Sequence, residues 1–227
     1  MQALFTLCTA VVFSCIFEIS QAQCNGTSCN GSVQVTTTTT SISVPNCNLS
    51  IEGSTNQSSV LTDLTPGEVF TVQAHCFNCC LNATTKPESV LNLTVTDVTT
   101  SSLSLNWTKP QGRSSIYSVQ WTDGGHSKEE TVTETFRVIS NLTPGVEYNI
   151  TVTAVAGDGE TKGSGVSISQ FTKPESVLNL TVTDVTTSSL SLNWTKPQGR
   201  SSIYSVQWTD GGDSKEETET VKQKEVV

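Results

Sequence analysis

Apolar residues alternate with polar residues in several short runs along the middle of the chain. Proline and glycine interrupt the pattern between runs, as at Pro144-Gly145. A period of two predicts strands with one buried face, and six or seven such strands with frequent turns indicate a β-sandwich. The predicted fold class is therefore all-β. The runs lie at residues 91–95, 103–107, 117–121, 136–138, 148–152 and 166–168.

A long internal repeat divides the chain into modules. The run from Lys86 to Gly125 recurs letter for letter from Lys173 to Gly212. A repeat of this length is too long for most solenoid units and is close to one small β domain. Identity extends to positions that a fold does not dictate, such as Arg113 and Arg200. We interpret it as a recent duplication and expect both copies to present the same surface.

The N-terminal segment has the features of a secretory signal peptide. An apolar run from Ala3 to Phe17 is followed by small residues at Ser20 and Ala22. Glu18 interrupts the run too early for a membrane span, and no later segment has the necessary length of about 18 apolar residues. An uncleaved anchor is the alternative, because a basic n-region is missing. Four segments are predicted: signal peptide 1–22, short cysteine-rich module 23–85, complete module 86–172 and truncated module 173–227.

The third module stops before the second half of a sandwich. It ends at Val227, ahead of any counterpart of the corner at 142–145 or the strand at 148–152. We therefore expect its apolar side chains to face no second sheet and its strand edges to stay open. We interpret the sequence as a fragment or a truncated gene model. The side chains concerned are Leu190, Leu192, Trp194, Tyr204, Val206 and Trp208.

The complete module resembles the fibronectin type III family, a group of immunoglobulin-like sandwiches. The resemblance rests on Trp107 followed by Pro110, on Tyr117 opening the third strand, and on the corner Leu142-Thr-Pro-Gly145 leading into Tyr148. In that family the corner tyrosine bonds back to the preceding turn, and the resemblance implies this role for Tyr148. The aromatic residues are expected in the core and not in a ligand cage. The expected core residues are Trp107, Tyr117, Leu142, Tyr148, Trp194 and Tyr204.

The first module departs from this pattern. Thr65-Pro66-Gly67 repeats the corner, but Phe70 stands where the second module has Tyr148, and phenylalanine has no hydroxyl to bond to the turn. The opening strands are hard to place in the threonine-rich stretch Thr36 to Thr40. Two interpretations stay open for that stretch, a strand or an O-glycosylated linker.

All six cysteines beyond the predicted signal peptide belong to the first module. An even number of cysteines in a small domain of an oxidising compartment favours disulfides, of which three would allow fifteen connectivities. The adjacent pair is expected to have separate partners. Zinc is the alternative because Cys76-x-x-Cys79 has ligand spacing, but no second pair with histidines follows. The disulfide candidates are Cys24, Cys29, Cys47, Cys76, Cys79 and Cys80.

Eleven Asn-x-Ser/Thr sequons are spread over the chain. Alternation places Asn92, Asn106 and Asn149 between inward-facing apolar residues, so these asparagines are expected to point outward and carry glycans. The full set of candidates is Asn25, Asn30, Asn48, Asn56, Asn82, Asn92, Asn106, Asn141, Asn149, Asn179 and Asn193.

Charge and motif content argue against several functions. A net charge of −9 with twelve Lys and Arg leaves no basic patch for nucleic acid. His75-Cys76 lacks the arginine of a cysteine-dependent phosphatase, because Asn82 occupies that place. His126 is replaced by Asp213 in the repeat, and Gly157-Asp158-Gly159 has no arginine to make an adhesion motif. We expect no enzyme activity, no metal and no cofactor.

The sequence of the repeats resembles that of the extracellular region of receptor-type tyrosine phosphatases with many fibronectin domains. The resemblance implies a glycosylated, non-catalytic array at the cell surface that binds an extracellular protein ligand, with any phosphatase activity in a cytoplasmic domain that this sequence lacks. A secreted adhesion or matrix protein and a passive spacer are the alternatives. Loops 111–115, 123–128 and 157–163 are the candidate binding surfaces.

Overall fold

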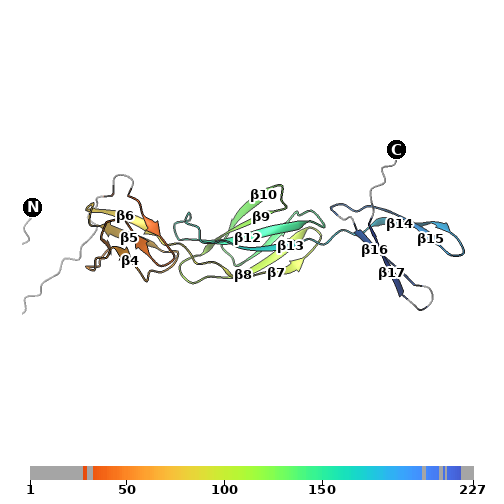
Figure 1. Cartoon of the computed structure of the whole chain (residues 1–227), viewed down its shortest axis with the longest axis horizontal. Helices are drawn as coiled ribbons and strands as arrows, with labels where there is room; N and C mark the ends of the chain where they lie inside the picture. Colours follow the sequence, from red (N-terminus) through yellow and green to blue (C-terminus); the bar gives the residue numbers. More distant parts are fainter. Residues whose placement is uncertain (1–27, 30–32, 201–202, 210–211, 213, 221–227) are drawn as a thin grey trace, which may run out of the picture.

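The computed structural model describes residues 28–29, 33–200, 203–209, 212 and 214–220. The predicted signal peptide lies outside these residues. Three modules follow one another along the long axis of the molecule, and each consists of β-strands (Figure 1). The predicted all-β fold is confirmed. Within the described ranges there is no helix of the length and apolarity that a membrane crossing requires.

The second module is a sandwich of two antiparallel sheets. One sheet has the strand order β11-β8-β7 and the other β10-β9-β12-β13. β12 pairs with β9 and with β13, so strands distant in the sequence become neighbours. The strands are β7 (Leu91–Val98), β8 (Ser102–Thr108), β9 (Ile116–Thr122), β10 (Ser127–Val132), β11 (Phe136–Ser140), β12 (Glu147–Val155) and β13 (Val166–Phe171).

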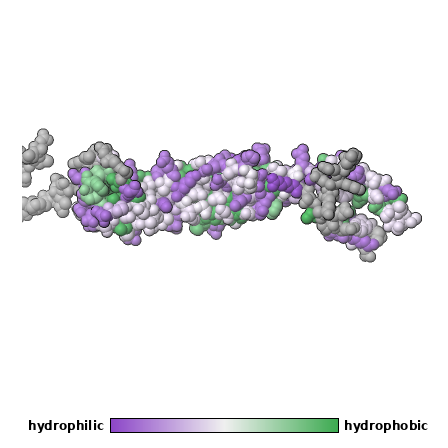
Figure 2. Space-filling model, turned by 45° about the horizontal axis from the view of Figure 1, so that its top comes forward, coloured by the Kyte–Doolittle hydropathy of each residue, from purple (hydrophilic) through white to green (hydrophobic). Residues whose placement is uncertain are grey.

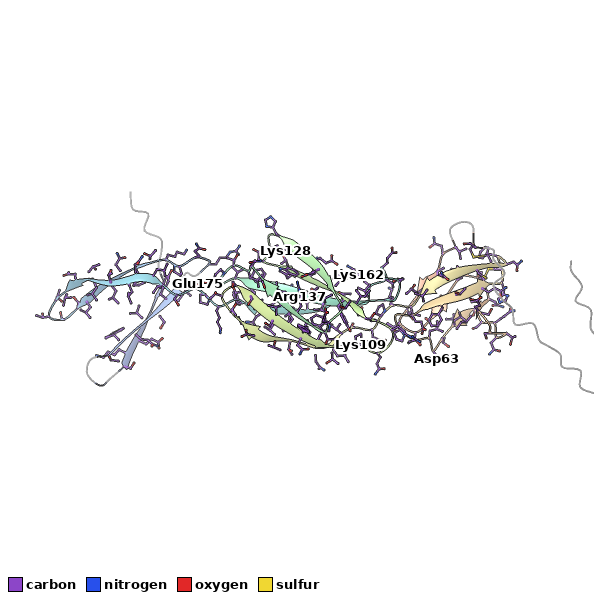
Figure 3. The ribbon with its side chains drawn as sticks, turned by 180° about the vertical axis from the view of Figure 1, so that it is seen from behind. Asp63, Lys109, Lys128, Arg137, Lys162 and Glu175 are labelled. Atoms are coloured by element: carbon purple, nitrogen blue, oxygen red, sulfur yellow. A yellow bond between two sulfur atoms is a disulfide. The ribbon has the colours of Figure 1, made fainter. Side chains whose placement is uncertain are left out.

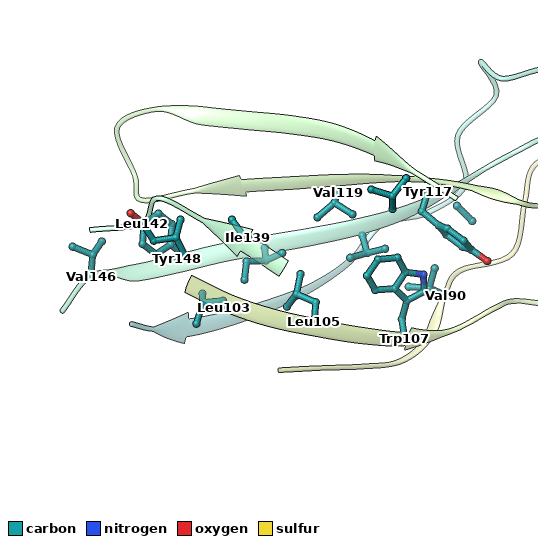
Figure 4. Packing of buried hydrophobic residues seen from close by; sticks show 14 residues of the cluster. Val90, Leu103, Leu105, Trp107, Tyr117, Val119, Ile139, Leu142, Val146 and Tyr148 are labelled. Atoms are coloured by element: carbon teal, nitrogen blue, oxygen red, sulfur yellow. The ribbon is translucent and has the colours of Figure 1, made fainter. Parts of the chain in front are cut away.

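The core of this module fills the space between the two sheets (Figure 4). Leu103 and Leu105 of β8 and Ile150 of β12 belong to this one buried cluster, and all three are at most 1% exposed. The Trp107 and Tyr117 rings meet edge to face, with centroids 5.4 Å apart. Such contacts between alternating inward residues of two sheets are what stabilises a sandwich.

The corner before β12 is closed by two hydroxyl groups. The backbone N–H of Thr143 donates to the Tyr148 hydroxyl at 3.0 Å, the bond that the resemblance implies. The Thr172 hydroxyl donates to the carbonyl of Thr143 at 2.7 Å and accepts from the N–H of Val146 at 3.1 Å. The end of the module is thus hydrogen-bonded to its own corner.

Two strands differ from the predicted alternation. The ladder between β7 and β8 shifts register between Leu91 and Thr94, where Asn92 has a φ of 53°, and this bulge leaves Leu91 52% exposed. In β11, Val138 is exposed and Ile139 is buried opposite Leu103. The inward positions predicted for Leu91, Phe136 and Val138 are therefore wrong. Phe136, Val138 and Ile139 put apolar side chains on both faces of β11, so a period of two could not set its phase.

Arg137 of β11 lies on the same face as Ile139 and ties the two sheets together at their edge. It pairs with Leu105 in the ladder, and its guanidinium donates to both carboxylate oxygens of Glu130 on β10, at 2.5 and 2.6 Å. Both side chains are more than one third exposed, so solvent screens the pair.

The first module has two smaller sheets. They have the strand orders β1-β2-β4 and β3-β5-β6. Of the threonine-rich stretch, Thr36 and Thr37 form a strand and Thr38 begins the turn that follows, where its N–H bonds to the Ser41 carbonyl. The strands are β1 (Thr36–Thr37), β2 (Ile42–Ser43), β3 (Leu49–Ile51), β4 (Val60–Leu61), β5 (Val69–Ala74) and β6 (Cys79–Thr84).

Disulfides tie the first module together. Cys29 is bonded to Cys79, and Cys47 to Cys76. Cys80 is also disulfide-bonded, so the adjacent cysteines have different partners, while Cys24 lies outside the described residues. The zinc alternative at Cys76 and Cys79 is wrong, because their sulfurs belong to two different disulfides. The same bond removes the Cys76 thiolate that a catalytic interpretation would need.

The described part of the third module consists of two hairpins. They are β14 (Leu178–Val185) with β15 (Leu190–Thr195), and β16 (Ile203–Thr209) with β17 (Ser214–Thr220). Leu190 is 61% and Trp208 40% exposed, and hydrophobic atoms reach the surface of this module (Figure 2). Tyr204, however, is 9% exposed, because its ring packs on Trp194 with centroids 5.5 Å apart. The ring of Tyr204 is therefore covered by a side chain of the same module, as its expected core position requires.

Candidate binding loops and module joints

Two of the three candidate loops meet the first module. Figure 3 shows Lys109 and Lys162 at the end of the second module that is nearer to the first module, where Asp63 lies, and Glu175 at the opposite end. Loops 111–115 and 157–163 belong to the Lys109 end. From the sequence, both loops are expected to be exposed connections. In the structure, both contact the corner of the first module.

Loop 111–115 makes the closest approach. The N–H of Arg113 donates to the carbonyl of Pro66 at 2.9 Å, and its guanidinium lies 3.5 Å from the Glu68 carboxylate. Gly112 touches the same carbonyl so closely that a Cβ atom would come within 2.2 Å of it. Ser114 is completely buried. The backbone of this loop therefore faces a neighbouring module and not a ligand.

Loop 157–163 is fixed by contacts to the first module and by the interactions of its charged side chains. The N–H of Gly157 donates to the Gly67 carbonyl at 3.0 Å. Partial desolvation acts to raise the pKa of Asp158, but hydrogen bonds from Thr161, the N–H of Glu160 and the Thr84 hydroxyl outweigh it and lower the pKa to about 2. Lys162 forms an ion pair of 2.6 Å with Glu129.

Loop 123–128 remains open to solvent. Its residues 123–126 form the turn between β9 and β10, and the Asp123 carboxylate accepts from the N–H groups of Gly125 at 3.0 Å and His126 at 3.3 Å. These two bonds lower the pKa of Asp123. Asp123 also lines a hollow at the second joint with Glu147 and Arg200. The side chains of His126, Ser127 and Lys128 in this loop are exposed.

The sequon asparagines in the described part of the chain all lie at the surface. Asn25 and Asn30 fall outside the described residues. Each of the remaining sequon asparagines is exposed, which leaves room for a glycan on each. These are Asn48, Asn56, Asn82, Asn92, Asn106, Asn141, Asn149, Asn179 and Asn193.

Sequence reasoning missed the joints between modules. The signal was present, because Thr-Lys-Pro occurs at both module boundaries, at 85–87 and 172–174, and Thr-Pro-Gly occurs in both corners. Thr85 and Thr172 are both buried. A buried threonine at a boundary distinguishes a docked connection from a free linker.

The sequence model of the fibronectin type III domain matches residues 85–170 and 172–226. The chain belongs to the fibronectin type III family. The seven strands of the second module and its corner tyrosine agree with this membership. The matched modules are of a non-catalytic type.

Several relatives share these fibronectin type III modules. The chain is 34% identical over 155 residues to receptor-type tyrosine-protein phosphatase eta of Gallus gallus, covering 63% of this chain and 11% of the relative. It is 40% identical over 139 residues to receptor-type tyrosine-protein phosphatase H of Homo sapiens, covering 58% of this chain and 12% of the relative. Tenascin-N of Mus musculus is 32% identical over 177 residues, covering 74% and 11%. The chain thus spans 11–12% of the length of these curated relatives.

A solved two-domain fibronectin type III segment from chicken tenascin also aligns with the chain. The alignment covers 62% of this chain and 98% of the segment, with 22% identity and a TM-score of 0.45.

Proposed function

We propose that this chain is a glycosylated, non-catalytic extracellular array that mediates cell-surface adhesion or ligand binding within the ectodomain of a receptor-type tyrosine phosphatase. The observation that carries the proposal is the similarity of its fibronectin type III modules to those of two receptor-type phosphatases, at 34% and 40% identity. Any phosphatase activity would reside in another domain.

The chemistry of the first module supports an extracellular location. Its disulfides, Cys29–Cys79 and Cys47–Cys76, persist in an oxidising environment and are rare in the cytosol. They also compensate for a small core, since short extracellular domains bury too little apolar surface to be stable alone. A signal peptide at residues 1–22 would deliver the chain to that compartment.

The surface supports glycosylation and protein binding. Asn106 on β8 and Asn149 on β12 are exposed on the outer faces of the two sheets. The partner is an extracellular protein or a neighbouring cell-surface protein, and loop 123–128 is its best-placed contact, because rigid strands position an accessible turn there. In secreted protein, a glycosidase should remove mass from peptides that contain Asn106 and Asn149.

A second candidate function is that of a secreted adhesion or matrix protein. The similarity to tenascin-N favours it, because this relative covers 74% of the chain at 32% identity. The passive spacer is a third reading of the same modules, in which the array only sets a distance.

Fractionation of the native protein separates these functions. An antibody against the first module would be used on membrane, medium and matrix fractions of the source tissue. The receptor hypothesis predicts an integral membrane protein much longer than this chain, whose immunoprecipitate dephosphorylates a phosphotyrosine peptide. Recovery from medium or matrix alone, without that activity, would favour the secreted protein. Beads coated with the array that fail to bind any cell would favour the spacer.

A further inference from the structure

The joint between the first and second modules is made by backbone groups that fit closely. The carbonyl of Pro66, in the corner of the first module, accepts the N–H of Arg113 from the second module. Gly112 has a φ of 100°, and the position of its absent Cβ lies 2.2 Å from the Pro66 carbonyl oxygen and 3.1 Å from the Pro66 Cβ. Only glycine combines this backbone conformation with this approach.

The joint between the second and third modules has the same geometry. The carbonyl of Pro144 accepts the N–H of Arg200 at 3.1 Å. Gly199 has a φ of 98°, and a Cβ there would lie 2.2 Å from the Pro144 carbonyl oxygen and 3.1 Å from the Pro144 Cβ. Outside the Thr-Pro-Gly corner and the threonine at the boundary, the first module differs in sequence from the second, so the equal Cβ distances in the two joints come from the contact itself.

The connection between modules is fixed in the same way at both boundaries. The Thr85 hydroxyl donates to the Thr65 carbonyl at 2.7 Å, as the Thr172 hydroxyl does to Thr143. The N–H of the next residue donates to the preceding module at 2.9 Å in both cases, from Lys86 to Thr38 and from Lys173 to Thr99. The first residues of each boundary are therefore fixed to the preceding module by hydrogen bonds.

We propose that the Thr-Pro-Gly corner of each module is a docking surface for the Gln-Gly-Arg loop of the module that follows, so that successive modules stack rigidly in one repeated orientation. The partner of this surface is another module of the same kind. The inference does not depend on what the array binds, because the contact lies between modules.

The features that differ between the joints show which groups are sufficient. The first joint also has the Glu68–Arg113 ion pair and the Gly157 bond to Gly67. In the second corner Val146 stands in the place of Glu68 and offers no carboxylate. The glycine fit and the carbonyl bond are common to both joints, and they define the docking surface.

Distance measurements on the whole secreted chain test this proposal. Spin labels on non-natural amino acids would be placed at Glu52 and Lys128, across the first joint, and in a second sample at Lys128 and Asp184, across the second. All three positions are exposed and lie away from the corners. Rigid docking predicts one narrow distance distribution for each pair. A broad distance distribution for both label pairs in the unaltered chain would overturn the proposal.

Glycine variants identify the contact. Gly112→Ala should widen the first distribution about twofold or more and leave the second unchanged, because only a shift of the modules can relieve a backbone clash. Gly199→Ala should do the reverse. The matched control is Gly124→Ala, which has a similar φ of 89° but nothing within 4 Å of the added Cβ.

The control separates docking from folding. Gly112→Ala and Gly124→Ala both place alanine at positive φ, so any cost to the stability of the second module should be similar. If Gly112→Ala disturbs folding, Gly199→Ala still tests the docking surface in a chain whose first two modules are unaltered. Unchanged distributions in both joint variants would contradict the proposal.

Discussion

The same run of residues exists twice in this molecule, once in a complete sandwich and once in two separate hairpins. The strands pair in the same register in both copies, including the register shift after Leu91 and after Leu178. Burial differs greatly: Leu103 is fully buried, whereas its counterpart Leu190 is 61% exposed. Identical sequence therefore gives the same strand register in the first hairpin of each copy but different burial.

The difference separates local from long-range determinants of the fold. Hairpin register follows from turns and from cross-strand pairs within the run itself. The Trp194–Tyr204 contact also forms without a second set of strands, as Trp107–Tyr117 does within the full sandwich. Full burial of Leu103, in contrast, requires β11 and β12, which come later in the sequence.

The largest expected effect comes from giving the third module the counterparts of β11, β12 and β13. Replacing residues 213–227 with a copy of residues 126–172 should bury Leu190 and Leu192, each contributing about 1.5–3 kcal/mol. Hydrogen exchange of the β15 amides should slow to the rate of β8. As a control, the same graft with aspartate in place of the copies of Ile150 and Val152 should leave exchange fast. Fast exchange in the correct graft would show that the covering strands are not what the third module needs.

A pair of matched substitutions measures the same difference within one chain. Leu103→Ala should destabilise the second module by about 2–5 kcal/mol, because it leaves a cavity in a closed core. Leu190→Ala should change the stability of the third module by no more than about 0.5 kcal/mol, as at most surface positions. Local hydrogen exchange would follow each module separately. An equal cost at both positions would contradict the comparison.

The corner tyrosine offers a smaller effect. Tyr148→Phe should cost about 1 kcal/mol, because the N–H of Thr143 loses its acceptor. The first module already has Phe70 at the corresponding place and relies on the Thr85 hydroxyl. Thr143→Ser keeps both the backbone donor and the sequon of Asn141, so urea unfolding should show it to be nearly neutral. A neutral Tyr148→Phe would mean that Thr172 suffices to close the corner.

The smallest expected effect is a pH dependence at the first joint. The folded-state pKa of Asp158 is about 2, below the ordinary 3.8, so its carboxylate stabilises loop 157–163 above pH 3.8. That stabilisation should be lost as the pH falls from about 4 through about 2. The amide NMR shifts of Glu160 and Thr161 should titrate in that range. Asp158→Asn should abolish the titration, and its persistence in the variant would assign it to another group.

Sequence patterns predicted most of the second module, because six alternating runs and a family corner leave few arrangements of an all-β chain. The phase of β11 could not be predicted, since Val138 and Ile139 are adjacent and only the ladder to Leu103 decides which of them faces inward. The disulfide partners of Cys29 and Cys47 also depend on distances between strands, which spacing in the sequence does not give.

The candidate site was harder to predict. Loops 111–115 and 157–163 have the polar, glycine-rich composition of a binding loop, and nothing within them reveals that Pro66 and Gly67 of another module accept their N–H groups. The repeated corner was visible in the sequence as a turn. Its second use, as a contact for the following module, depends on how the modules stack.

The left-handed asparagines affect how glycosylation can be studied by mutagenesis. Asn92, Asn141 and Asn179 are sequon residues with φ values of 53°, 58° and 53°, a conformation that asparagine adopts far more readily than glutamine. An Asn→Gln change would therefore remove the glycan and strain the backbone together. Replacing the threonine two positions later removes the acceptor sequence without straining the backbone, and at Thr94 and Thr181 it also removes one hydroxyl bond to the carbonyl of Asn106 or Asn193. A secretion defect found with the first kind of variant and absent from the second would be due to backbone strain and not to the sugar.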